Sequence, residues 1–326
     1  MKQTVQKIMS PSKGVLALDW SPSTIAKQFK SIGIASIPEL NRVYRQMLVT
    51  TPKLNNFISG IILHEDTVNQ KLDNEKGFVE YLGGLGIVSG VRADDGKSKY
   101  NDSGQYITEG LDGLDERLKG YSKKGIKFTK WRAAFKISDY YPSKEFLKES
   151  IDRLVAFATT SHKYGLVPLV EPDVEMKGNH TTTRCSEVTA QVLELLFNEL
   201  KRADVDISDV ILKTNMVLPG TESGVEAAPL EVANATLYAF RKSIPKDVGG
   251  IVFLSGGQSY DDSVQHLDKI EDLSKKDPWE FSFSFARALQ KDALMVWKGK
   301  EENINEAQKV LMARLIKVTK ARKGEL

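Results

Sequence analysis

Short apolar runs alternate eight times with longer amphipathic stretches along this chain, and this repeat limits the folds open to it. Each run has the length and near-continuous hydrophobicity of a strand buried on both faces, which is typical of parallel sheets covered by helices. Eight such units in roughly 275 residues predict an α/β fold, a single (β/α)₈ TIM barrel. The runs are Gly14–Trp20, Phe57–His64, Gly86–Asp94, Lys127–Ile137, Leu166–Val174, Val210–Met216, Gly250–Gly257 and Glu280–Phe285.

The segments between the runs favour helices. Three of them have apolar residues at helical spacing: Ser143–Tyr164, Ser186–Lys201 and Pro229–Arg241. The amphipathic segment Asn305–Lys323 predicts an extra terminal helix that ends in a solvated basic run. The polar segment Asp95–Gly110 is interpreted as a long loop. No linker divides the chain, so we expect one catalytic domain over residues 1–326.

The composition is that of an ordinary globular protein. Of 326 residues, 41% are hydrophobic and 27% are charged, and the net charge is +3. This balance gives no reason to expect nucleic acid or an anionic membrane as a partner, and no run approaches the roughly 18 apolar residues of a membrane span. The N-terminal segment lacks the apolar core of a signal peptide, and the single cysteine, Cys185, is interpreted as a structural thiol. We therefore expect a cytoplasmic protein.

Polar and charged residues gather at the C-terminal ends of the predicted strands, where barrels of this kind have their active sites. Four strands carry two such residues two positions apart, which places both side chains on one face. Polar or charged residues occur at the C-terminal ends of seven strands in all, so we interpret them as one polar mouth rather than as separate surface ion pairs. The residues are Asp19, Arg92, Asp94, Lys130, Arg132, Glu171, Asp173, Lys213, Asn215, Ser255, Ser284 and Arg287.

Two of these residues are lysines, and the pair indicates a particular chemistry. Lys130 and Lys213 in one low-dielectric mouth repel each other's charge, and loss of water also disfavours an ammonium group. Both effects lower the pKa of an amine and favour its nucleophilic neutral form, which forms a Schiff base with a ketone. The iminium is an electron sink for cleavage of a neighbouring C–C bond. Glu171 and Asp19 are candidates for the two proton transfers that this requires.

The end of the seventh strand predicts a phosphate site. Ser255, Gly256 and Gly257 combine a hydroxyl with flexible backbone, and Arg287 follows the eighth strand. Loops after these two strands commonly bind phosphate through backbone N–H groups and a helix N-terminus. The sequence thus favours a phosphorylated small molecule as substrate. The chain's four histidines lack the spacing of a zinc site, so we expect neither a metal nor another cofactor.

Several motifs at these positions occur in one known family and in its order. The most specific are KWR (130–132), VEP (170–172), LKTNM (212–216) and FLSGGQS (253–259). Together with GVLALDWSPSTIAKQF and SFSFARALQKDALMVWKGKEEN they span nearly all of residues 14–310. Through them the chain resembles the class I (Schiff-base) fructose-1,6-bisphosphate aldolases. The resemblance implies reversible cleavage of fructose 1,6-bisphosphate into dihydroxyacetone phosphate and glyceraldehyde 3-phosphate, in a homo-oligomer that is commonly a tetramer.

The resemblance also implies residue roles. Lys213 is the Schiff-base lysine, Glu171 is the acid/base that forms and dehydrates the carbinolamine, and Asp19 is the base at the C4 hydroxyl. Lys130 assists charge and proton handling beside the Schiff base. A second set binds the substrate or supports the site: Ser255, Gly256 and Arg287 at the phosphate of the dihydroxyacetone half; Lys27 and Arg92 at the distal phosphate; Ser21 as a further substrate- or phosphate-binding residue; Arg132 in placing the substrate; Asp173 in ordering the surroundings of the two lysines; and Asn215 as a support.

The chain departs from the family pattern at several positions. Trp20 stands in place of an acid beside the base, and Gln28 and Arg92 stand where the family often has Arg and Lys. Ala286 replaces the glycine before the phosphate-site arginine, and Asp173 replaces a glutamate. The family's C-terminal tyrosine has no counterpart here, so we expect another group or water to carry that proton.

Other functions stay open from the sequence. One is a Schiff-base aldolase for another phosphorylated ketose, such as sedoheptulose bisphosphate, because the distal-phosphate positions differ. Another is a non-catalytic barrel scaffold, which would not require Lys213, Glu171, Asp19 and Lys130 together. A zinc-dependent aldolase is a third, and the scattered histidines argue against it.

Overall fold

The eight predicted strands form one sheet in the computed structural model, which describes residues 1–101 and 104–326. Neighbouring strands pair in parallel, in the order β1-β2-β3-β6-β7-β8-β9-β10. The Ala17 N–H donates to the Phe285 carbonyl at 3.4 Å and links the last strand to the first. The strands are β1 Gly14–Leu18, β2 Ile58–Leu63, β3 Val88–Arg92, β6 Phe128–Phe135, β7 Val167–Val174, β8 Ile211–Thr214, β9 Gly250–Phe253 and β10 Phe281–Phe283. The predicted barrel is confirmed.

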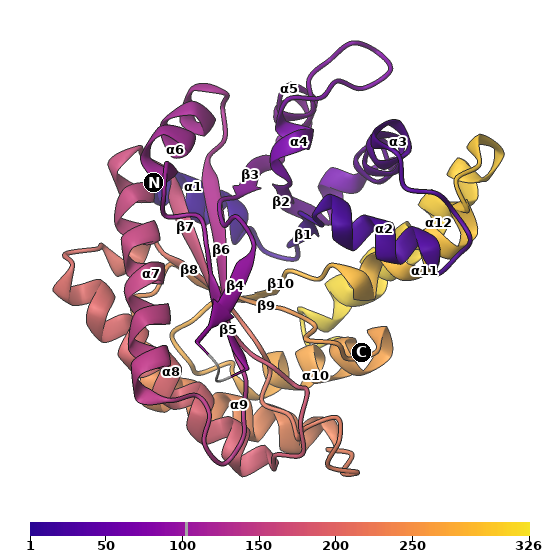
Figure 1. The fold of residues 1–326 in the computed structure, drawn as a ribbon. Coiled ribbons are helices and arrows are strands. Elements are labelled where there is room, and N and C mark those ends of the chain that lie inside the picture. Colours follow the sequence, from indigo (N-terminus) through magenta and orange to yellow (C-terminus); the bar gives the residue numbers. More distant parts are fainter. Residues whose placement is uncertain (102–103) are drawn as a thin grey trace.

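Helices surround this sheet (Figure 1). They are α2 Pro22–Lys30, α3 Pro38–Val49, α4 Glu65–Val68, α5 Phe78–Gly84, α6 Leu114–Lys123, α7 Lys144–Lys163, α8 Thr182–Arg202, α9 Pro229–Ser243, α10 Tyr260–Leu273 and α11 Arg287–Trp297, with α1 Lys2–Ile8 and α12 Ile304–Ala321 at the two ends. Short 3₁₀ turns lie at Leu54–Asn56, Ile207–Asp209 and Glu301–Asn303. The sequence predicted α7, α8, α9 and α12 within a few residues. None of the helices in the described ranges is long and apolar enough to cross a bilayer.

The barrel interior is divided into an apolar floor and a polar mouth. Inward residues in the N-terminal halves of the strands, such as Val15, Phe128 and Leu169, form a buried cluster. Val5 and Ile8 of α1 belong to the same cluster and close this end of the barrel. Close packing sets residue sizes on this floor: a Cβ on Gly90 of β3 would lie 2.4 Å from the Phe128 ring. Because side chains alternate along a strand, the next inward positions upward are the predicted polar ones.

The segment predicted as a long loop after β3 is instead an antiparallel hairpin of β4 Lys97–Tyr100 and β5 Gln105–Thr108. Its polarity hid it from the sequence analysis, because β4 faces solvent and carries only one large apolar residue. Ile107 is buried, and the Thr108 hydroxyl donates to the Arg132 carbonyl at 2.7 Å. The hairpin is thus attached to the rim of the barrel beside β6.

Arg322, which follows α12, ties the two chain ends together at the floor of the barrel. Its buried guanidinium donates to the carbonyls of Phe281 (2.8 Å), Ser10 (2.6 Å), Met9 (3.1 Å) and Lys13. Burial lowers the pKa of Arg322 to about 10, although nearby Glu271 partly opposes this shift. We expect Arg322→Met to lower the free energy of unfolding by about 3 kcal/mol, because the buried carbonyls of Met9 and Phe281 lose this donor.

Urea unfolding of the variant measures this loss. Arg241→Met is the matched control, because Arg241 makes a two-bond pair with Asp277 from a half-exposed position. We expect the control to cost less than about 1 kcal/mol. Equal losses in the two variants would contradict the role assigned to Arg322.

Candidate active site

The predicted polar residues line one cavity of about 740 Å³ at the C-terminal ends of the strands. Strand alternation explains why they meet there. In β6, Lys130 and Arg132 face the cavity, whereas Trp131 between them is buried against Phe157 of α7, with ring centroids 5.6 Å apart. Twelve of the thirteen predicted site residues line the cavity: Asp19, Ser21, Lys27, Arg92, Lys130, Arg132, Glu171, Asp173, Lys213, Ser255, Gly256 and Arg287.

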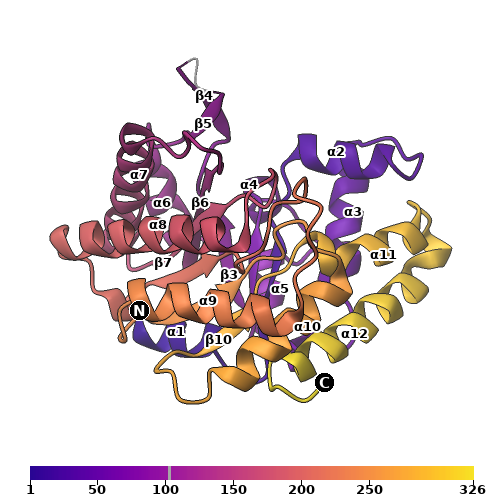
Figure 2. The same cartoon turned by 90° about the horizontal axis from the view of Figure 1, so that it is seen from below.

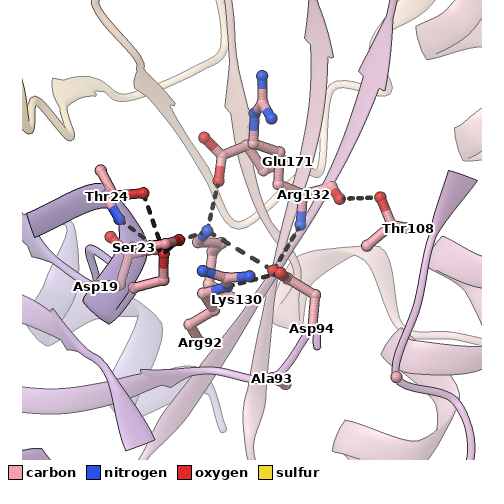
Figure 3. Close-up of polar contacts among 12 residues, drawn as sticks. Asp19, Ser23, Thr24, Arg92, Ala93, Asp94, Thr108, Lys130, Arg132 and Glu171 are labelled. Atoms are coloured by element: carbon pink, nitrogen blue, oxygen red, sulfur yellow. Dashed lines mark hydrogen bonds and ion pairs between the residues drawn. The ribbon is translucent and has the colours of Figure 1, made fainter. Parts of the chain in front are cut away.

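The four predicted catalytic residues form a continuous chain of opposite charges. Lys213 Nζ lies 3.2 Å from Glu171 Oε1, and Glu171 Oε2 lies 3.3 Å from Lys130 Nζ. Lys130 Nζ then lies 2.7 Å from Asp19 Oδ2 (Figure 3). All four residues are less than 10% exposed. A buried chain of this kind can pass protons between a nucleophile and two carboxylates.

The electrostatics differ from the sequence expectation for one lysine. Burial opposes the charge of Lys130, but the carboxylates of Asp19 and Glu171 outweigh it, so the pKa of Lys130 is raised rather than lowered. Burial likewise works against ionised Asp19 and Glu171, yet Lys130 and Lys213 reverse this and lower the pKa of both carboxyls. The prediction erred because it counted lysine–lysine repulsion and overlooked the number of carboxylates around Lys130.

The two lysines therefore have different surroundings, which the sequence could not distinguish. Lys130 Nζ has Asp19, Glu171 and Asp94 within 4 Å. Within the described ranges, Lys213 Nζ has a carboxylate of Glu171 alone at such a distance. The three carboxylates hold Lys130 as an ammonium ion.

Asp94 belongs to this network, although the sequence analysis placed it in the polar mouth without assigning it a role. Its carboxylate lies 2.6 Å from Arg92 Nε and 3.8 Å from Lys130 Nζ, and it accepts the backbone N–H of Arg132 at 3.4 Å (Figure 3). Its side chain is 6% exposed. The signal was present in the sequence, since Asp94 shares the parity of Arg92. The resemblance named only Arg92.

One end of the cavity has the features of a phosphate site. Gly256 and Gly257 after β9 adopt positive φ values of 58° and 98°, and a Cβ on Gly257 would lie 3.6 Å from Arg287 Nη2. Arg287 is the first residue of α11, and Ala286 before it gives the helix no side-chain cap. The glycine turn, the first residue of α11 and its guanidinium thus line the same cavity, which suits an anion.

A second helix N-terminus opens on the cavity at α2. Ser21 caps this helix by accepting the Thr24 N–H at 3.3 Å, and Ser21, Ser23 and Thr24 line the cavity with Lys27. The uncharged Gln28 lines the same wall. The residues at the N-termini of α2 and α11 therefore line the same cavity as the lysine–carboxylate chain.

Comparisons with known proteins agree with this geometry. The family model described as "Glycolytic: Fructose-bisphosphate aldolase class-I" matches residues 1–326. The chain belongs to the class I fructose-bisphosphate aldolase family. It is 40% identical over 316 residues to a probable class 1 fructose-bisphosphate aldolase of Xanthomonas axonopodis pv. citri (strain 306), covering 96% of this chain and 94% of that one.

Two further relatives extend the comparison. A muscle-type fructose-bisphosphate aldolase of Lethenteron camtschaticum is 40% identical over 322 residues, covering 98% of this chain and 89% of that one. The fructose-bisphosphate aldolase of Plasmodium falciparum, solved in complex with TRAP and a small-molecule inhibitor, superposes with a TM-score of 0.97 at 35% identity, covering 99% and 94% of the two chains. The chain is therefore a lyase with an aldolase barrel.

Two supporting residues of this aldolase lie differently from the sequence expectation. Asp173 accepts from Arg132 Nη2 at 2.7 Å and has no ion pair with either lysine among the described residues. Asn215 lies outside the cavity lining. It accepts the Val174 N–H at 3.2 Å and donates to Thr189 Oγ1 at 3.3 Å, which joins β7 to α8. The parity argument fails there because β8 ends at Thr214.

Trp20, which stands beside Asp19 where the family has an acidic residue, belongs to an aromatic cluster. Its ring stacks on Tyr44 with centroids 6.2 Å apart, and its carbonyl accepts from Arg45 Nη2 at 3.0 Å. These contacts fix the backbone next to Asp19.

Cys185 lies outside the catalytic cavity and is 2% exposed. Burial raises the pKa of its thiol, as expected of a structural cysteine. In the part of the chain that the structure describes, no three His, Cys, Asp or Glu residues are grouped to hold a metal ion.

Proposed function

We propose that Lys213 forms the Schiff base through which this aldolase cleaves fructose 1,6-bisphosphate into dihydroxyacetone phosphate and glyceraldehyde 3-phosphate, and catalyses the reverse condensation. The observation that carries the proposal is the position of Lys213 Nζ, which is buried 3.2 Å from Glu171 in the cavity that residues at the N-termini of α2 and α11 also line. No metal takes part in the proposed chemistry.

The chain of charges suggests how the steps proceed. Glu171 takes a proton from the Lys213 ammonium group, the neutral amine adds to the C2 carbonyl to form the carbinolamine, and Glu171 returns the proton to the departing hydroxyl, which gives the iminium and water. Asp19 accepts the proton of the C4 hydroxyl, the C3–C4 bond breaks, and its electron pair moves into the iminium to form an enamine. The aldehyde leaves. Protonation at C3 and hydrolysis then release dihydroxyacetone phosphate and free Lys213.

The remaining residues bind and orient the substrate in this proposal. Lys130 stays charged and keeps Asp19 and Glu171 ionised between turnovers. Ser255, Gly256 and Arg287 hold the phosphate of the dihydroxyacetone half. Arg132, itself positioned by Asp173, places the sugar chain, Asn215 supports the ends of β7 and β8, and Ser21, Lys27 and Arg92 face the distal phosphate.

Borohydride trapping tests the proposal directly. The protein is mixed with dihydroxyacetone phosphate in the presence of a chelator, reduced with borohydride, and mapped by peptide mass. We expect a stable adduct on the peptide that contains Lys213. A folded protein that cleaves the substrate but yields no adduct, or that loses activity in the chelator, would overturn the Schiff-base proposal.

We further propose a cytoplasmic homo-oligomer, a tetramer by family resemblance, in which residues 1–326 form one catalytic domain. A related Arabidopsis thaliana aldolase, 40% identical, is described as cytosolic. A groove between α8 and α9 exposes Leu230 (52%) and Tyr238 (66%), which suits contact with a second copy. Light scattering measures the assembly mass, and a single unfolding transition is expected of one domain.

A further inference from the structure

We infer that Lys97, on the β4–β5 hairpin, binds the phosphate farther from Arg287 and so makes this aldolase prefer a bisphosphate ketose over a monophosphate. The inference rests on the proposed function and deepens it. It concerns a residue that neither the sequence motifs nor the resemblance included, because the hairpin was interpreted as a loop. The hairpin's place on the rim, a cation–π contact and the charge state of the cavity support it.

The hairpin places Lys97 at the catalytic cavity. Lys97 is the first residue of β4 and pairs in register with Thr108, which is bonded to the Arg132 carbonyl on the rim. Lys97 Nζ lies 4.4 Å from the centroid of the Tyr106 ring, and both residues line the cavity. Figure 2 shows the hairpin and α2 standing apart at the same end of the barrel. The two elements form facing walls of the mouth.

The charges of the cavity explain why this lysine is needed. Arg92 and Arg132 are each paired with a carboxylate, Asp94 at 2.6 Å and Asp173 at 2.7 Å. Across residues 1–101 and 104–326, neither Lys27 nor Lys97 has a carboxylate within 4 Å, and Gln28 adds no charge to the α2 wall. Within the same described residues, Lys177 also lines the cavity without such a partner. A phosphate between α2 and the hairpin therefore meets an uncompensated ammonium group on each of these two walls.

Tyr106 prepares Lys97 for this role without blocking it. The ring face attracts the ammonium group and holds it at the cavity wall, yet it takes up none of its charge as a carboxylate would. An arriving phosphate can then replace this weak contact with a charge-assisted hydrogen bond. The hairpin thus supplies a positioned but unpaired cation.

Substrates that differ only in the second phosphate isolate the effect. We expect Lys97→Met to lower kcat/KM for fructose 1,6-bisphosphate about five- to twentyfold, mainly through KM, because one charge-assisted hydrogen bond is lost. Cleavage of fructose 1-phosphate, which keeps only the phosphate at Arg287, should change less than about twofold. Its rate in the same variant also shows that the barrel has folded.

Lys99→Met is the matched control. Lys99 has the same charge and the same strand parity, but it lies two register pairs nearer the hairpin tip and outside the cavity lining. We expect it to leave the ratio of the two substrates' kcat/KM values unchanged. Tyr106→Leu should lower the ratio partly and Tyr106→Phe should preserve it, because phenylalanine keeps the ring face.

The outcomes separate this inference from the proposed function. An unchanged ratio in Lys97→Met, or an equal change in Lys99→Met, would overturn the role of Lys97, the latter by showing only a long-range field effect. If the unmodified enzyme gives no borohydride adduct on Lys213, the proposed function itself fails. An adduct together with an unchanged ratio rejects the Lys97 inference alone.

Discussion

Replacing Lys213 with methionine should eliminate cleavage of fructose 1,6-bisphosphate and the borohydride adduct together. The expected loss in kcat exceeds the roughly 10²–10⁴-fold that follows removal of a single proton-transfer group, because the whole covalent route is lost. Steady-state cleavage assays and peptide mapping measure the two effects. The variant should still bind the bisphosphate, since the residues proposed to bind the phosphate groups are other members of the cavity lining.

Lys213→Arg separates covalent catalysis from charge. Arginine keeps a cation near Glu171, but it does not provide a neutral amine at working pH. We expect this variant to be as inactive as Lys213→Met and to keep more of the protein's stability, because the carboxylate retains a partner. Substantial turnover by either variant would show that Lys213 is not the nucleophile.

The barrel could be predicted from the sequence because its signal is repeated and local. A buried strand such as β7 is an apolar run whose inward positions turn polar toward its C-terminal end. The β4–β5 hairpin has no such signal, since its stability comes from Ile107 and Thr108 packing on a neighbouring element. Contacts between distant segments of this kind are not encoded in any single window of sequence.

In the active site too, features set within one strand could be predicted from the sequence, whereas contacts between strands could not. Parity along β6 and β7 placed Lys130, Arg132 and Glu171 correctly in the cavity, but it failed at Asn215, which lies beyond the last residue of β8. The sequence identified the charged residues of the mouth, but it did not show which of them form ion pairs. Three carboxylates around Lys130 are a property of the closed barrel, so the direction of its pKa shift could only be found there.

The second large effect is expected at Lys130, through the carboxylates that it faces. Lys130→Met removes the cation 2.7 Å from Asp19 and 3.3 Å from Glu171. Burial then prevails at both carboxyls, although Lys213 still opposes it, and their pKa values rise. We expect kcat to fall about 10²–10⁴-fold, and the acidic limb of the pH–rate profile to move to higher pH. Lys130→Arg should restore much of the pH profile, because the charge returns.

The pH dependence of the free energy of unfolding should reflect the same electrostatic interactions, in a direction that the pKa shifts determine. In the unmodified protein, the pKa values of Asp19 and Glu171 are lowered on folding. Their contribution to stability is therefore fully present above the unfolded pKa, about 4, and is lost as the pH falls through the folded values. In Lys130→Met, burial should raise the folded pKa values above the unfolded ones, so the variant loses stability as the pH rises through that range.

The two proteins should therefore differ most near neutral pH, by about 3–5 kcal/mol, the usual result of removing one member of a buried ion pair. The difference should narrow toward pH 4–5, where the carboxyls of the variant bind protons and no longer carry unpaired charge. Urea unfolding at pH 5 and pH 7.5 measures both values. A difference that stays constant with pH would mean that Lys130 contributes by packing alone, because the loss of apolar contacts does not depend on the protonation of Asp19 and Glu171.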